Sequence, residues 1–117
     1  MKKIKIKFIG LGLKDEYQAY VIVYDNCHNI IYNDYTYNGN ITVKLNSNQS
    51  YKLIATSLED CISTIFYVNY KICEYKFIFN RSIYEKNNDQ TITFLLTDYN
   101  YNNLPIEKGE LNLCPSQ

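Results

Sequence analysis

The sequence predicts an all-β protein, an antiparallel Greek-key β-sandwich of about seven to nine short strands, and three observations support this. Apolar and polar residues alternate in short runs, as in residues 41–45 and 91–97. Turn-forming residues separate these runs at intervals of roughly 8–12 residues. No segment sustains a helical period, and the 46% of hydrophobic residues is rich in β-branched and aromatic types, which favour strands.

The first two expected strands cover residues 3–9 and 18–25. In residues 3–9, lysines alternate with apolar residues, so one face is expected to be solvated and the other to enter the core. The outward residues are Lys3, Lys5 and Lys7, and the inward residues are Ile4, Ile6 and Phe8. Residues 18–25 are apolar on both faces, which predicts a central strand.

A meander of three strands is expected to follow over residues 29–57. Residues 29–37 form one strand, and the Asn38-Gly39 pair predicts a hairpin turn, because both residues accept a positive φ at low cost. Residues 41–45 and 51–57 form the next two strands, separated by a polar connector. We expect residues 41–45 to pair with the strand before Asn38, and residues 51–57 to pair with 41–45.

The C-terminal half predicts shorter and less regular elements. Residues 62–70 and 74–80 are expected to form a hairpin that turns near residues 69–73, followed by a polar loop over residues 81–90. Residues 91–97 alternate clearly and form a strand. An Asn/Tyr loop follows at residues 98–103, and residues 110–113 form a last short strand.

Part of this pattern resembles a known family. The quoted runs are VIVYD (21–25), TYNGN (36–40), ITVKL (41–45) and YKLIA (51–55). They are similar to the "V-x-V-x-D", "T-x-x-x-G" and "Y-x-L" patterns of prealbumin-like (transthyretin-like) sandwiches, namely carboxypeptidase regulatory-like and Cna B-type domains. The resemblance implies a prealbumin-like sandwich that serves as an accessory, adhesive or structural module rather than as an enzyme.

Length and charge limit the possible functions. The 117 residues predict one domain spanning 1–117. The net charge is +0 and the lysines are scattered along the chain, so nucleic-acid binding is not expected. No run reaches the roughly 18 apolar residues of a membrane span, and no secretory signal is recognised. We therefore expect a cytoplasmic protein on synthesis, or a virion component if the chain is phage-encoded.

The four cysteines do not indicate a metal or redox site. Cys27, Cys61, Cys73 and Cys114 include no C-x-x-C pair, so the sequence predicts neither a zinc ribbon nor a redox dithiol. We expect reduced thiols that are buried as small hydrophobic residues.

Catalytic groups are sparse. His28 is the one histidine, and it stands beside Cys27 in an expected turn, where adjacent side chains point apart. Asp25 and Asp98 both follow strands and could approach each other at one end of a sandwich, but a strand-end aspartate commonly caps a turn. The sequence therefore predicts no enzyme, no catalytic residues, no metal and no cofactor.

Two clusters of tyrosine and asparagine are the candidate binding residues. Tyrosine offers an apolar ring with a polar tip, and asparagine offers both a donor and an acceptor, which suits a protein partner or a sugar. Codon bias toward A and T would also enrich both residues. The candidates are Tyr32, Tyr35, Tyr37 and Asn38 in the first cluster, and Tyr99, Asn100, Tyr101 and Asn102 in the second.

These observations together predict a non-enzymatic structural, adhesion or assembly module. Its partner is expected to be another protein or a second copy of the chain, and a phage- or prophage-encoded virion-associated protein is the context that fits its size. The alternative is a carbohydrate-binding module that uses the Tyr/Asn loops to bind a glycan.

Overall fold

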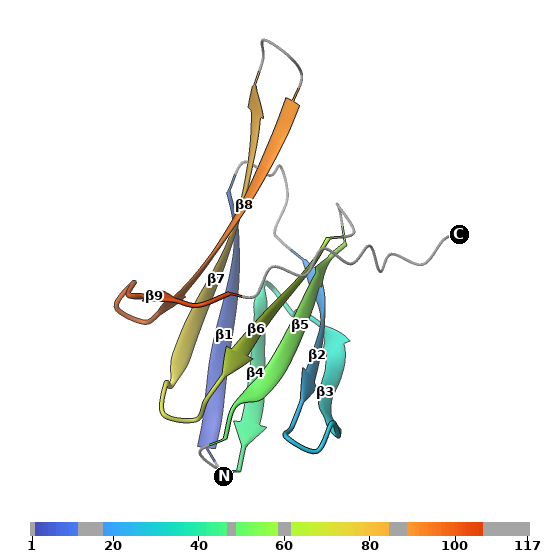
Figure 1. The fold of residues 1–117 in the computed structure, drawn as a ribbon, viewed down its shortest axis with the longest axis vertical. Coiled ribbons are helices and arrows are strands. Elements are labelled where there is room, and N and C mark those ends of the chain that lie inside the picture. Colours follow the sequence, from blue (N-terminus) through green and yellow to red (C-terminus); the bar gives the residue numbers. More distant parts are fainter. Residues whose placement is uncertain (1, 12–17, 47–48, 59–61, 85–88, 107–117) are drawn as a thin grey trace, which may run out of the picture.

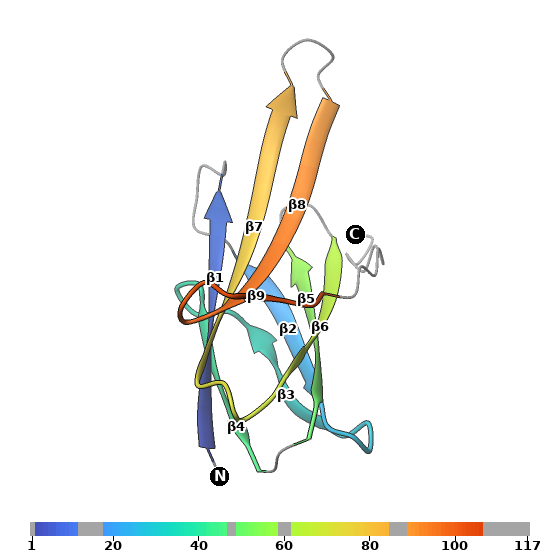
Figure 2. The ribbon, with the colours of Figure 1, turned by 60° about the vertical axis from the view of Figure 1, so that its left-hand side comes forward.

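The structure is a computed structural model that describes residues 2–11, 18–46, 49–58, 62–84 and 89–106. These residues form an all-β sandwich of nine strands in two sheets, as the sequence predicts (Figures 1 and 2). Its longest dimension is 49 Å and its shortest is 24 Å.

The first sheet has five strands in the order β4-β1-β7-β8-β9. All neighbours are antiparallel except β1 and β7, which run parallel. The strands are β1 (Lys2–Leu11), β4 (Asn40–Leu45), β7 (Glu74–Tyr84), β8 (Asp89–Asp98) and β9 (Asn103–Leu104). The parallel pair differs from the all-antiparallel arrangement expected from the sequence.

The second sheet has four antiparallel strands in the order β3-β2-β5-β6. They are β2 (Ala19–Tyr24), β3 (Ile30–Tyr35), β5 (Tyr51–Ser57) and β6 (Ser63–Val68). β2 lies between two neighbours, which confirms that it is a central strand. Its pairing with β3 shifts register at Val23/Tyr24, where β3 carries a bulge.

The core lies between the inward faces of the two sheets. The expected inward trio of β1 is buried, with Ile4 and Ile6 at 0% exposure and Phe8 at 4%. Phe77 of β7 is near the centre, because its ring centroid lies 5.3 Å from that of Phe66 in the opposite sheet and 5.5 Å from that of Phe8. The two layers are thus joined by apolar contacts from strands that are distant in sequence.

The expected meander is wrong in its pairings. Asn38 and Gly39 do form a tight turn with φ values of 52° and 74°, and Tyr37 and Asn40 bond each other's backbone on both sides of it. Beyond this single bridge the chain changes sheets, so that β4 pairs with β1 and β5 pairs with β2 and β6. The turn was predictable from local residues, whereas the partner of each strand depends on distant contacts.

Two expectations for the C-terminal half are also wrong. β6 and β7 lie in different sheets, so residues 69–73 cross between layers and do not close a hairpin. Residues 81–90 are not a loop, because β7 continues to Tyr84 and β8 begins at Asp89. The β1 pairing ends at Asn80, and the two strands extend beyond the sandwich as a ribbon (Figures 1 and 2).

The expectation of buried cysteines is wrong where it can be compared with the structure. Cys27 and Cys73 are free thiols, and both are exposed in connections between strands. Cys61 and Cys114 lie outside the described residues, as does the expected strand over residues 110–113.

Candidate functional site

Two turns of the structure are built alike. Each has the sequence Asp-x-x-x-Asn, at 25–29 between β2 and β3 and at 98–102 between β8 and β9. In the first, Asp25 Oδ1 accepts hydrogen bonds from the backbone N–H groups of Cys27 and Asn29, both at 2.8 Å. The Asn29 amide donates to Asp25 Oδ2 at 3.2 Å. The fourth residue, His28, has a φ of 64°.

The second turn repeats each of these contacts. Asp98 Oδ1 accepts from the backbone N–H groups of Asn100 and Asn102, both at 2.9 Å, and the Asn102 amide donates to Asp98 Oδ2 at 3.0 Å. Tyr101 stands at the fourth position with a φ of 63°. We call these two segments the Asp–Asn turns. Their aspartates therefore act as structural caps of the backbone.

The same contacts argue against acid–base chemistry at these aspartates. The Asn29 backbone N–H holds the pKa of Asp25 below its usual value, with smaller help from the Asn29 side chain, Cys27 and the charge of His28. The Asn102 amide does the same for the pKa of Asp98. The turns lie in different sheets and stand apart in both views (Figures 1 and 2), so the two carboxylates do not form a pair.

The first Tyr/Asn cluster is divided by the structure. Tyr32 faces the core, where burial raises the pKa of its phenol, and its hydroxyl donates to the Tyr35 carbonyl at 3.2 Å. Tyr35 and Tyr37 are 55% and 81% exposed, and Asn38 belongs to the tight turn. Tyr35 and Tyr37 therefore remain available for binding, whereas Tyr32 and Asn38 have structural roles.

The second cluster gathers around a lysine. Tyr99 and Tyr101 are 64% and 63% exposed. The Lys76 ammonium lies 3.9 Å from the ring centroid of Tyr101 and 5.1 Å from that of Tyr99, which places both rings in cation–π range. Asn100 is exposed beside them, and Asn102 is held by Asp98.

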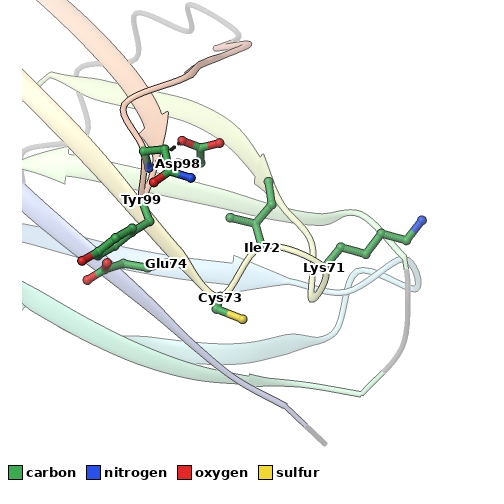
Figure 3. A pocket seen from close by; sticks show the side chains of 7 residues that line it. Lys71, Ile72, Cys73, Glu74, Asp98 and Tyr99 are labelled. Atoms are coloured by element: carbon green, nitrogen blue, oxygen red, sulfur yellow. Dashed lines mark hydrogen bonds between the residues drawn. The ribbon is translucent and has the colours of Figure 1, made fainter.

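A shallow pocket of about 470 Å³ lies next to this cluster, between the β6–β7 connection and the second Asp–Asn turn. Figure 3 shows Tyr99 close to Glu74, while the Lys71 side chain extends away from the other residues. The residues lining the pocket are Lys71, Ile72, Cys73, Glu74, Asp98, Tyr99 and Asn100. Both oxygens of Asp98 already accept hydrogen bonds, so this carboxylate is not free to take part in an acid–base pair. The pocket therefore offers the Tyr99 ring and polar groups for binding.

The outward face of the four-stranded sheet is apolar, and we call it the apolar face. Ile22, Ile54 and Ile65 are direct cross-strand neighbours in its middle row, and each is half-buried. Tyr67 is 44% exposed, and Tyr20 packs edge-to-face on Tyr35 with centroids 5.0 Å apart. The apolar face consists of Tyr20, Ile22, Tyr24, Ile54, Ile65 and Tyr67, extended by Ile30 and Tyr35 on the edge strand β3.

Beside an apolar row of Ile9, Ile78 and Leu95, the outward face of the five-stranded sheet carries a basic row, which we call the lysine face. Its members alternate with buried residues on β1, β4 and β7 and so share the side of the sheet that faces away from the core. The register places Lys3 opposite Lys44 and Lys7 beside Lys76. The lysine face consists of Lys3, Lys5, Lys7, Lys44 and Lys76. Five of the chain's eleven lysines are therefore gathered on one side of this sheet, which the sequence alone does not show.

Among the described residues, no cluster of three or more His, Cys, Asp and Glu side chains could hold a metal ion. The same part of the chain contains no helix with the length and apolar character of a membrane span.

Comparison with known proteins gives no relative. No protein-family model, no curated protein and no solved structure matches the chain. The prealbumin-like resemblance therefore remains a prediction from the sequence patterns.

Sequence reasoning missed both sheet faces as sites. The alternation of Lys3, Lys5 and Lys7 and the two apolar faces of residues 18–25 were visible signals. Joining them to Lys44, Lys76, Ile54 and Ile65 requires the strand order, which no local pattern supplies.

Proposed function

We propose that the protein is a non-enzymatic assembly module that associates with a second copy of its own chain through the apolar face. The observation that carries this proposal is the outward-facing, half-buried middle row Ile22–Ile54–Ile65, beside the exposed Tyr67. Antiparallel sheets commonly leave one face to water and carry polar side chains there. The outward face of this antiparallel sheet is apolar instead, and a contiguous apolar surface patch marks an interaction site. In the described part of the chain, the outward side of this sheet is covered by no other strand.

Charge favours a second copy as the occupant. Lys52 is the one charged side chain among the outward-facing residues that the register places on β2, β5 and β6, so two apolar faces related by a two-fold axis can approach without strong repulsion. Two lysine faces could not do so. The four-stranded sheet is therefore the one expected at the interface, and the lysine faces would lie on the two outer sides of the dimer.

The size of the apolar face indicates a reversible dimer. Four strands spaced by about 4.8 Å and six residues rising about 3.3 Å each give a face of roughly 400 Å². This is within the range of functional patches on monomers, about 300–600 Å², and below the roughly 800 Å² per partner of a standard interface. We expect an association that depends on protein concentration.

The prealbumin-like family is part of the same proposal. Its support is the set of sequence patterns together with a two-layer arrangement in which the chain passes between sheets at β1–β2, β3–β4, β4–β5 and β6–β7. A phage-encoded virion-associated protein is the setting in which we place such an assembly module.

A charge placed in the middle row tests the proposed surface. Ile54→Glu should shift the sedimentation profile of a concentrated sample toward monomer, because each face would bury a carboxylate. Thr42→Glu, an exposed site on the other sheet, is the matched control and should leave the profile unchanged. Thermal unfolding of both variants confirms that they fold. If Ile54→Glu retains the wild-type profile, the apolar face is not the interface.

A carbohydrate-binding module is the second candidate, favoured by the exposed Tyr99 side chain, which lines the pocket (Figure 3). A neutral glycan would stack on the ring and use the Asn100 amide. Binding in a glycan array that disappears in Tyr99→Ala and persists in Lys5→Gln would support this function. An array without any binding would remove it.

A further inference from the structure

We propose that the lysine face, with Tyr99 and Tyr101 at its edge, binds single-stranded nucleic acid. The zero net charge describes the chain as a whole and not the distribution of its lysines. The sheet order places five of them on one side of the molecule. This inference concerns the sheet opposite the apolar face and is independent of the proposed dimer.

The strand register arranges the lysines of this face in a row of positive charges. Lys3, Lys5 and Lys7 follow every second residue of β1, which spaces them by about 6.6 Å along the strand. Lys44 and Lys76 widen the row at its two ends as cross-strand neighbours of Lys3 and Lys7. Glu74, the neighbour of Lys5, offsets part of this charge. A flat row of this kind can follow the backbone of an extended polyanion.

The placement of the lysines has an energetic cost. Like charges directly opposite each other destabilise a sheet, and here two such pairs, Lys3–Lys44 and Lys7–Lys76, occur in a chain that has as many acidic as basic residues. No carboxylate lies within 4.0 Å of the five ammonium groups in the part of the chain that the structure describes. A bound polyanion would remove this repulsion.

The tyrosines favour nucleic acid over other polyanions. Proteins that bind single strands combine a basic track with aromatic rings on which bases stack. Here Lys76 lies over the rings of Tyr99 and Tyr101, so the aromatic pair is continuous with the charged row, and both residues are more than half exposed. An anionic polysaccharide has no planar base to stack, and a duplex hides its bases.

The test is fluorescence anisotropy of the full chain with fluorescein-labelled oligo-dT of about 20 nucleotides, in a salt series from about 50 to 200 mM. We expect binding whose log–log salt dependence has a slope of about −3.5, since each of the five lysines would contact one phosphate at about −0.7 per phosphate. Heparin and an unlabelled duplex of equal length serve as competitors and should compete more weakly than unlabelled oligo-dT.

Variants connect the binding to this face. The triple variant Lys3→Gln, Lys5→Gln, Lys7→Gln should abolish binding, whereas Lys52→Gln with Lys71→Gln, which removes two lysines outside the lysine face, should retain it. Tyr99→Ala with Tyr101→Ala should weaken binding by about fivefold or more and leave the salt slope unchanged, because stacking is uncharged.

Three results would overturn the proposal. They are no binding at about 50 mM salt, full binding by the triple lysine variant, and equal competition by heparin or duplex with no effect of the tyrosine variant. The last result would identify an unselective cationic surface. Circular dichroism of each variant confirms its fold.

Discussion

At the scale of single residues, the fourth position of each Asp–Asn turn holds a residue in an unfavourable conformation. His28 and Tyr101 have φ values of 64° and 63°, a region that glycine enters without a steric penalty. We predict that His28→Gly stabilises the protein by roughly 0.5–1 kcal/mol, the usual size of such backbone effects. Urea unfolding measures the change. His28→Ala is the control and should give no gain; equal free energies for the two variants would show that φ is not the cause.

The two aspartate caps predict a pH dependence. Their folded pKa values are lowered from 3.8, so their stabilising effect is complete above pH 3.8 and is lost as the pH falls through the lowered pKa values. The variant Asp25→Ala, Asp98→Ala should be less stable than wild type at pH 7, and the difference should shrink below pH 3.8. A difference in the free energy of unfolding that stays constant with pH would contradict this assignment.

The core offers a direct test of packing between the layers. Phe77 is fully buried and its ring contacts Phe8 and Phe94 in its own sheet and Phe66 in the other. Phe77→Ala should cost about 3–5 kcal/mol, the usual penalty for removing a buried aromatic ring. Phe77→Leu keeps more of the volume and should cost less. Chemical unfolding distinguishes them, and a loss below 1 kcal/mol for Phe77→Ala would be inconsistent with the described packing.

At the scale of elements, the lysine face predicts a salt effect on folding. Lys44→Thr removes the charge opposite Lys3 and places a strand-forming residue there. It should stabilise the protein by about 0.5 kcal/mol at low salt, and the gain should decline as salt screens the repulsion. The measurement is the unfolding midpoint at low and high ionic strength. A gain that does not vary with salt would point to β-propensity alone.

Strands and turns could be predicted from the sequence because their signals are local. The alternation in residues 3–9, the Asn38-Gly39 turn and the turn-forming role of Asp25 all depend on residues a few positions apart. Strand pairing is different. Residues 41–45 pair with β1, more than thirty positions earlier, because the inward sides of Ile41 and Val43 continue the layer of Ile6 and Ile4. Core packing decides this pairing, and the residues of the turns carry no signal of it.

At the scale of the whole molecule, the two outer sides of the sandwich differ in charge. The four-stranded sheet presents mainly isoleucine and tyrosine, and the five-stranded sheet presents five lysines together with Ile9, Ile78 and Leu95. Both candidate surfaces depend on the sheet order, so neither could be predicted in full from the sequence. The predicted tyrosine clusters are now divided between them: Tyr35 borders the apolar face, and Tyr99 and Tyr101 border the lysine face.

The central claim is that the apolar face joins two copies of the chain. Its most direct test is the absolute mass in solution, measured by size-exclusion chromatography with light scattering over a concentration series under reducing conditions. The account predicts a mass that rises with concentration from 13.8 kDa to twice that value and then stays constant. A mass that remains at 13.8 kDa at every concentration would contradict it.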